Sequence, residues 1–186
     1  MLSNKLYKMM VIALFAAIIG ILAQITIPLP FVPITGQTLA IGLAATILGP
    51  KYGTYTTLLY ILLGAAGVPV FAAMTAGFGV IFGPTGGFII GFIPGVIGIG
   101  FYIEKVRFTV LHAIFANILG MLITLIFGTV WLKFIAQLTW MEAIFSGFVP
   151  FLFVGIIKAV LAGWAGHLVR NRLTEANLLR FMKQAV

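Results

Sequence analysis

Long apolar runs alternate along the chain with short segments that contain proline, glycine or charged residues. Runs of this length predict transmembrane helices, because about 20 apolar residues cross a hydrocarbon core roughly 30 Å thick. The pattern predicts six spans, at about residues 6–27, 38–50, 52–67, 87–102, 108–133 and 142–169. The second and third are short for a full crossing. Residues 170–186 mix basic and apolar side chains, which predicts an interfacial tail after the last span.

Two of the connecting segments cannot be regular helix. Residues 28–33 contain three prolines, and residues 68–86 are rich in glycine up to the run Gly83-Pro84-Thr85-Gly86-Gly87. Irregular backbone at membrane depth survives only where protein buries it or where it lines a cavity. The glycine-rich segment is therefore either a plain turn or a loop that folds into the bundle and caps a binding cavity. Its apolar composition favours the cap.

Composition and charge placement set the class and the orientation. The 186 residues are 62% hydrophobic and 8% charged, with a mean hydropathy of +1.23, which excludes a soluble domain. The net charge of +8 falls on one side if both termini are cytoplasmic, because segments 28–37, 68–86 and 134–141 contain no Lys or Arg. Trp131 and Trp140 then lie at the outer interface. We expect an all-α bundle of six transmembrane helices in a single domain, with both termini cytoplasmic and irregular outer loops over a ligand cavity.

Lys158 is the sharpest candidate for chemistry. It lies about 20 Å from the outer end of the last span, at a depth where a charge costs about 2.5–3.5 kcal/mol on insertion scales. The chain has three carboxylates, Glu104, Glu142 and Glu175, and none is an evident partner. Lys158 is either satisfied by backbone carbonyls or held neutral, or it meets an anionic ligand in a wet cavity. We favour the ligand.

Other polar groups leave alternatives open. Thr35, Gln37 and Thr38 either bond a ligand or cap the second span, and Thr75 and Thr85 in the glycine-rich loop have the same two roles open to them. His112 and Asn117 lie five residues apart on the fifth span, too far round the helix to share a face well, so we expect structural roles for both. Ala13 and Ala17 form a small-xxx-small pair that permits close helix contact, within this bundle or with a partner.

The residue inventory argues against other function classes. The absence of cysteine, with two histidines and three acidic residues, makes a metal site improbable. No nucleophile–base pair appears, and no phosphate-binding motif, so neither an intramembrane enzyme nor an ATPase is expected. A self-contained ion-coupled transporter would need carboxylates or a repeat pair, and we find neither. The positive charge follows the membrane orientation and does not indicate nucleic acid.

The order of several motifs resembles the BioY family, the biotin-binding S components of energy-coupling factor (ECF) importers. The matching motifs cover nearly the whole chain: Thr35-Gly36-Gln37-Thr38, Leu48-Gly49-Pro50-Lys51-Tyr52-Gly53, Gly67-Val68-Pro69-Val70-Phe71, Gly83-Pro84-Thr85-Gly86-Gly87-Phe88 and Ile157-Lys158-Ala159. The resemblance implies a non-enzymatic, high-affinity vitamin-binding subunit in the bacterial cell membrane. It implies work with a transmembrane coupling subunit (T component) and two ABC ATPase subunits. It also shifts Ala13 and Ala17 towards docking on that coupling subunit.

The candidate ligand-binding residues are Thr35, Gln37, Thr75, Gly83, Thr85, Gly86, Gly87, Gly155 and Lys158. Two of them depart from the family pattern. Gly155 stands where the family has aspartate in Pro-Gly-Asp-x-x-Lys-Ala, and Thr75 stands where it often has asparagine. Biotin, with its polar ureido head, is the expected ligand. Lipoate, with the same valerate tail and a nearly apolar head, is the alternative that the two departures favour.

Overall fold

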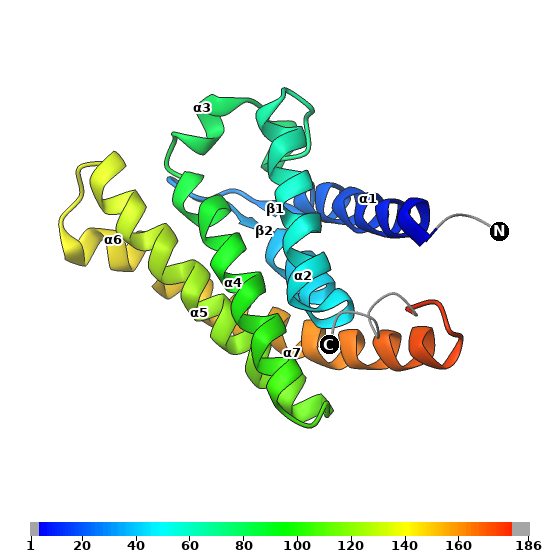
Figure 1. Ribbon diagram of the computed structural model, residues 1–186. Coiled ribbons are helices and arrows are strands. Elements are labelled where there is room, and N and C mark those ends of the chain that lie inside the picture. The colour runs from blue at the N-terminus through cyan, green and yellow to red at the C-terminus, as the bar shows by residue number, and fades with distance from the viewer. Residues whose placement is uncertain (1–3, 180–186) are drawn as a thin grey trace.

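The computed structural model describes residues 4–179, and almost all of its regular structure is helical (Figure 1). A short antiparallel ribbon, in which Thr26 pairs with Thr35 and Ile27 with Ile34, joins the first two helices. The elements in chain order are α1 (Asn4–Ala23), β1 (Thr26–Ile27), β2 (Ile34–Thr35), α2 (Gln37–Ala65), the 3₁₀ turn η1 (Ala72–Met74), α3 (Phe78–Ile81), α4 (Gly86–Lys105), α5 (Val110–Ile135), α6 (Trp140–Gly147) and α7 (Val149–Glu175).

Helix α2 is a helical hairpin and not a straight rod. Gly49 has a φ of 70°, a left-handed conformation that glycine adopts without strain, and Pro50 follows it. The Gln37 amide bonds the Tyr60 hydroxyl across 23 residues, and in a straight helix those residues would lie about 35 Å apart. The chain therefore folds back at Gly49. We call residues 37–48 the first limb and residues 50–65 the second limb.

Counting the two limbs separately gives the predicted six-helix bundle. Within residues 4–179, four helical segments are long and apolar enough to cross a membrane: Lys5–Ala23, Gly86–Lys105, Val110–Ile135 and Trp140–Glu175. The two limbs of α2 complete the six and match the short spans predicted at 38–50 and 52–67. The prediction of an all-α membrane bundle is confirmed.

The last span differs in detail from its predicted bounds of 142–169. It is divided into α6 and α7 at Phe148, and Pro150 occupies the first turn of α7, where its missing N–H costs no helical hydrogen bond. Helix α7 then continues to Glu175 because residues 170–175 contain no glycine or proline. The first part of the predicted tail is thus helix, and residues 180–186 of that tail lie outside the described residues.

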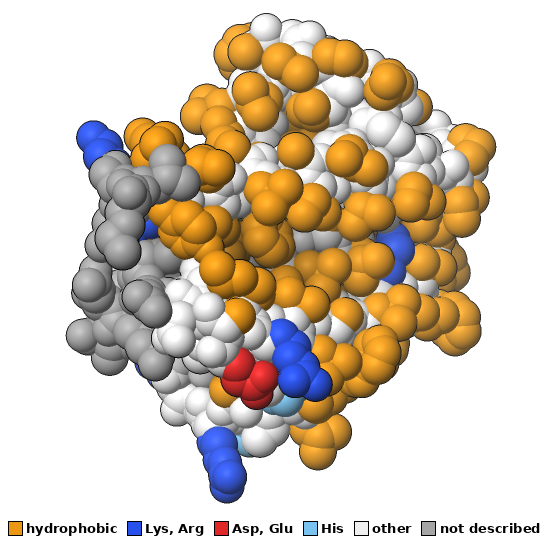
Figure 2. Space-filling view, turned by 90° about the vertical axis from the view of Figure 1, so that its right-hand side faces the viewer, with side chains coloured by type: hydrophobic (Ala, Val, Ile, Leu, Met, Phe, Trp, Pro, Cys, Tyr) orange, Lys and Arg blue, Asp and Glu red, His pale blue; other side chains and the backbone are white. Residues whose placement is uncertain are grey.

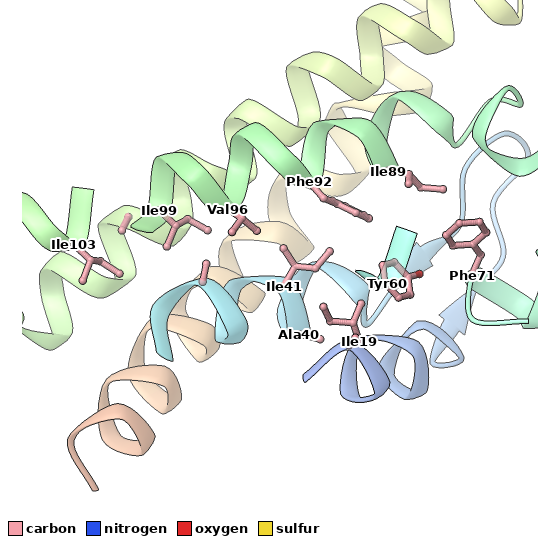
Figure 3. Packing of buried hydrophobic residues seen from close by; sticks show 13 residues of the cluster. Ile19, Ala40, Ile41, Tyr60, Phe71, Ile89, Phe92, Val96, Ile99 and Ile103 are labelled. Carbon is pink, nitrogen blue, oxygen red and sulfur yellow. The ribbon is translucent and has the colours of Figure 1, made fainter. Parts of the chain in front are cut away.

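The main core lies where α1, the two limbs and α4 meet (Figure 3). Ile19 from α1, Tyr60 from the second limb and Val96 from α4 have no exposed surface, and Phe71 from the following loop packs edge-on against Tyr60. Phe71 also fills the space above Gly64, where a Cβ would overlap its ring. These contacts fasten the loop after α2 to the helices.

Large apolar side chains cover much of the outer surface, as expected for a protein that lipid surrounds. Leu111, Phe153 and Ile21 are 78%, 74% and 68% exposed. Figure 2 shows hydrophobic side chains over most of the face to the right of Figure 1, with Lys and Arg side chains mainly towards its left and lower margins. Helices that face lipid do not need the polar outer stripe of soluble helices.

The beginning of α1 and the end of α7 lie on the same side of the molecule (Figure 1). The Tyr7 hydroxyl donates a 2.8 Å hydrogen bond to the Leu178 carbonyl. On this side, Arg170 Nη1 donates a 3.0 Å hydrogen bond to the carbonyl of Thr46, in the last turn of the first limb. Pro50 has no N–H with which to satisfy that carbonyl. Arg170 thereby ties α7 to the bend of the hairpin.

Candidate ligand-binding site

A cavity of about 350 Å³ lies between the first limb, α4, α5 and α7. Val32 and Pro33 from the proline loop and residues from the segment 71–85 also line it. Its walls are mostly apolar, with side chains such as Ile41, Phe92 and Phe151 and a few polar groups among them. This size and lining are typical of a small-molecule site. The glycine-rich segment is therefore part of a cavity wall, as its apolar composition indicated.

Three side chains, from the end of α1, from α2 and from α5, hold that segment in place. Gln24, just after α1, donates to the Phe71 carbonyl at 3.2 Å and accepts from Met74 N–H at 2.8 Å. The Tyr60 hydroxyl donates to the Val70 carbonyl at 3.1 Å, and Trp131 Nε1 on α5 donates to the Gly83 carbonyl at 3.0 Å. Irregular backbone in the bundle is thus satisfied by polar side chains, as a low-dielectric setting requires.

Lys158 lines the cavity from α7. Its Nζ donates to the Thr35 carbonyl at 2.7 Å and lies 3.4 Å from Thr38 Oγ1. No carboxylate is within ion-pair distance of it, since the ion pair found within residues 4–179 joins Arg172 and Glu175. Both sequence alternatives therefore have a basis in the structure: Lys158 bonds a backbone carbonyl, and it is also the charged group of the cavity wall.

Thr35 and Gln37 line the cavity, but their polar atoms bond mainly to each other and to Tyr60. Thr35 Oγ1 donates to Gln37 Oε1 at 2.8 Å, and the Gln37 backbone N–H donates back to Thr35 Oγ1 at 3.3 Å. Gln37 Nε2 donates to the Tyr60 hydroxyl. This buried network fixes the start of the first limb, and with it the Thr35 carbonyl that receives Lys158.

The three loop candidates Thr75, Gly83 and Thr85 also line the cavity. Thr75 Oγ1 donates to the Ala72 carbonyl at 2.8 Å, and Thr85 Oγ1 donates to the Val80 carbonyl at 3.2 Å. Each hydroxyl therefore already donates its hydrogen bond to a carbonyl of the loop. Towards a ligand, these threonines can offer lone pairs and not donors.

Gly86 and Gly87 are not among the cavity-lining residues. Both are buried where α4 begins against α5, and a Cβ on Gly87 would overlap Trp131 while one on Gly86 would overlap the Ile81 carbonyl. The small size of Gly87 lets α4 and α5 approach closely, and that of Gly86 leaves room for the Ile81 carbonyl at the end of α3, which accounts for both glycines without a ligand contact.

Gly155 does line the cavity, but the space beside it is taken. A Cβ at this position would overlap Met121 Sδ from α5, and Met121 itself lines the cavity. Where the family pattern has an aspartate, this chain therefore presents a thioether. Nothing near Gly155 in the sequence indicated that Met121 would fill this place, because the two residues lie on different helices.

Asn117 lines the cavity although the sequence did not indicate it as a ligand-binding candidate. We expected a structural role, and part of its side chain has one, since Nδ2 donates to Thr46 Oγ1 and to the Ala113 carbonyl, both at 2.8 Å. However, Asn117 also lines the cavity while only 3% exposed. His112, by contrast, bonds Thr109 and the Arg107 carbonyl near the start of α5, away from the cavity.

Small residues lie on both the inner and the outer face of α1. Ala16 and Gly20 face inward, where a Cβ on Gly20 would lie 3.3 Å from Val70. Ala13 and Ala17 are exposed and lie on the outer face of α1. They therefore do not pack within this bundle.

Comparison with known proteins agrees with this architecture. A profile of the BioY family matches residues 2–175. The chain is 44% identical over 177 residues to "Biotin transporter BioY2" of Lactococcus lactis, covering 95% of this chain and 97% of that protein. It is 41% identical over 149 residues to "Biotin transporter BioY" of Thermotoga maritima, covering 80% and 87%.

A solved structure has the same fold. The crystal structure of the S-component for biotin from an ECF-type ABC transporter superposes with a TM-score of 0.84 at 27% identity, over 92% of this chain and 95% of that one. These relatives are named as transport proteins and not as enzymes. By a family match that spans nearly its whole length and by its close full-length relatives, the chain belongs to the BioY family.

Proposed function

We propose that this chain captures biotin at the outer face of a bacterial cell membrane, as the S component of an ECF-type ABC importer. The observation that carries the proposal is a largely apolar cavity with a single lysine among its lining residues, on a fold shared with a biotin S-component. An apolar body with one carboxylate matches that lining, because the cation supplies the charge partner and the walls supply hydrophobic contact.

An S component of an ECF-type importer works with coupling partners. The chain carries no ATP-binding motif, so a transmembrane coupling subunit and two ATPase subunits would supply the energy. We propose that the coupling subunit docks on the outer face of α1 at Ala13 and Ala17, since both are exposed and small. With the termini in the cytoplasm, the loops over the cavity face outward, where a scarce vitamin is captured.

Lipoate is the second candidate, and one observation favours it. Met121 fills the space beside Gly155, so the cavity wall is apolar at the position where the family pattern has a carboxylate. A dithiolane head would be accepted there without an unpaired polar group. The carboxylate of lipoate would still meet Lys158.

Titration of the purified protein with both ligands tests the proposal. We expect saturable binding of biotin by calorimetry, with weaker binding of lipoate. Uptake of labelled biotin by cells tests the transport role. We expect uptake when the chain is expressed with a coupling subunit and active ATPases, and no uptake when the ATPases are inactive. Binding of lipoate alone would establish the second candidate, and binding of neither would refute this account of the cavity.

A further inference from the structure

The carboxamide of Asn117 has a fixed orientation inside the cavity wall. Thr46 Oγ1 donates its hydrogen bond to the Gly42 carbonyl at 2.8 Å, so it can only accept a hydrogen bond from Asn117. The Ala113 carbonyl is also only an acceptor. Two acceptors on one side require the NH₂ group there, which removes the usual ambiguity between amide oxygen and nitrogen.

The opposite atom, Oδ1, is left as an acceptor beside the cavity. Within residues 4–179, no donor is hydrogen-bonded to it. It lies against Gly42, where a Cβ would overlap it, and both Gly42 and Asn117 line the cavity. Glycine at position 42 thus leaves room for the oxygen. An amide oxygen that opens into the cavity and that no described protein donor satisfies needs a donor from within the cavity, so this group indicates a ligand donor.

Asn117 Oδ1 differs in kind from the threonine oxygens of the lining. The hydroxyls of Thr35, Thr75, Thr85 and Thr124 all donate to protein acceptors and keep lone pairs only, whereas Oδ1 is an amide carbonyl oxygen, which is the stronger acceptor. The cation lies one helical turn away, since Lys158 approaches Thr38, and Gly42 is four residues further along the first limb, a rise of about 6 Å. The cavity therefore presents a cation and a strong neutral acceptor at separate points in apolar walls.

From this geometry we propose that Asn117 is a specificity-determining residue, whose Oδ1 accepts a hydrogen bond from an N–H group on the head of the bound ligand while Lys158 meets its carboxylate. The inference rests on the proposed function and narrows it. A cyclic urea such as the ureido ring of biotin has the required N–H. A dithiolane does not, so the residue selects biotin over lipoate. Asn117 takes over the polar recognition that Gly155 cannot provide.

The test compares Asn117→Leu with the unaltered protein, using biotin and lipoate as probes. Leucine has nearly the same size and shape but no acceptor. We expect biotin affinity to fall about tenfold or more and lipoate affinity to change little, because only biotin loses a hydrogen bond. Thr129→Val is the matched control, since Thr129 is a buried, unpaired hydroxyl on the same helix outside the cavity. It should leave both affinities unchanged.

A second measurement does not depend on how the variant folds. Biotin methylated on both ureido nitrogens is titrated against the unaltered protein, and we expect its affinity to fall strongly because no N–H remains. Equal affinity for biotin and the methylated compound would overturn the inference, as would unchanged biotin affinity in a folded Asn117→Leu protein. Absence of biotin binding by the unaltered protein would instead refute the proposed function, so the two failures are distinguishable.

Discussion

A single lysine supplies the charge of the cavity, and its surroundings explain how a buried cation is tolerated. Lys158 reaches the Thr35 carbonyl at 2.7 Å, at the point where β2 ends and the first limb of α2 begins. That carbonyl is an acceptor that a strand end leaves available to a side chain. The dipole of the Thr35 carbonyl stabilises the ammonium group without neutralising its charge, so an anionic ligand group would stabilise it further.

Replacing Lys158 with methionine should weaken binding of a carboxylate ligand by about 2–5 kcal/mol, the cost of breaking a buried charge pair. The fold should persist, since losing a buried charge also removes its desolvation cost. Calorimetric titration of Lys158→Met against the unaltered protein measures the effect. Lys133→Met is the control, because Lys133 lies outside the cavity against Phe134 and Trp140. Unchanged affinity in Lys158→Met would make the lysine purely structural.

Among elements, the contact between α4 and α5 depends on the glycines at the start of α4. Gly87 lies against Trp131, and the same tryptophan donates to the Gly83 carbonyl in the loop over the cavity. One residue of α5 therefore sets both the spacing of two helices and the position of the loop. A side chain larger than hydrogen at Gly87 would disturb both.

Gly87→Ala should accordingly lower stability by about 1–3 kcal/mol through overpacking. The loss of folded protein with temperature, followed by size-exclusion chromatography in detergent, measures it. Gly79→Ala is a suitable control, since a Cβ there meets nothing within 4 Å. If both variants melt at the same temperature, the close approach of the two helices does not matter for stability.

The outer face of α1 is the element proposed to meet the coupling subunit. Replacing both Ala13 and Ala17 with tryptophan should abolish co-purification with that subunit while leaving ligand affinity intact, because neither residue lines the cavity. Pull-down and calorimetry on the same preparation measure the two effects. Leu111→Trp is the control, placed on α5 at a site 78% exposed. A double variant that still assembles and imports would place the docking face elsewhere.

Sequence patterns anticipated the elements better than the contacts between them. Apolar runs and proline positions indicated six spans, including the two short ones, because local hydropathy and backbone chemistry determine them. Mid-membrane charge singled out Lys158 for the same reason. Gly86 and Gly87, by contrast, were assigned to the ligand on the basis of the loop motif. The structure places Gly86 against the Ile81 carbonyl and Gly87 against Trp131, 44 residues away in the chain.

Asn117 and Met121 show most clearly which features of the site sequence patterns cannot predict. The role of Asn117 depends on Thr46, 71 residues earlier, which orients the amide. That of Met121 depends on Gly155, on another helix. Neither pairing leaves a mark in local composition or periodicity, so only the packed structure reveals them.

At the scale of the whole molecule, the two ends of the bundle have different tasks. One end holds the ligand cavity, covered by the proline loop and the glycine-rich segment. The other end brings together Arg170, the hairpin bend and the ring of Phe108, which lies 4.7 Å from the guanidinium carbon. Thr46 belongs to both, since its hydroxyl orients Asn117 and its carbonyl receives Arg170. The cavity wall and the opposite end therefore share one residue of the first limb.

The hairpin of α2 also has a consequence for biogenesis. Its limbs, residues 37–48 and 50–65, extend for only about 18 Å and 24 Å, less than a hydrocarbon core of about 30 Å. Neither limb is a competent insertion signal by length. They pack against α1, which is made earlier, and against partners made later, notably α4, where Gly100 lies directly against Pro50. During synthesis the hairpin should thus not integrate stably into the membrane until α4 has emerged from the ribosome.

Nascent chains ended after residue 70 or after residue 107 test this order of assembly. The chain has no cysteine, so one introduced at Ile41, which packs in the same core cluster as Phe92 and Val96 of α4, is a unique probe for a water-soluble thiol reagent. We expect the probe to react in the shorter chain and to be protected in the longer one. Protection in both would mean that the hairpin integrates on its own, and that synthesis of this membrane protein does not wait for its fourth span.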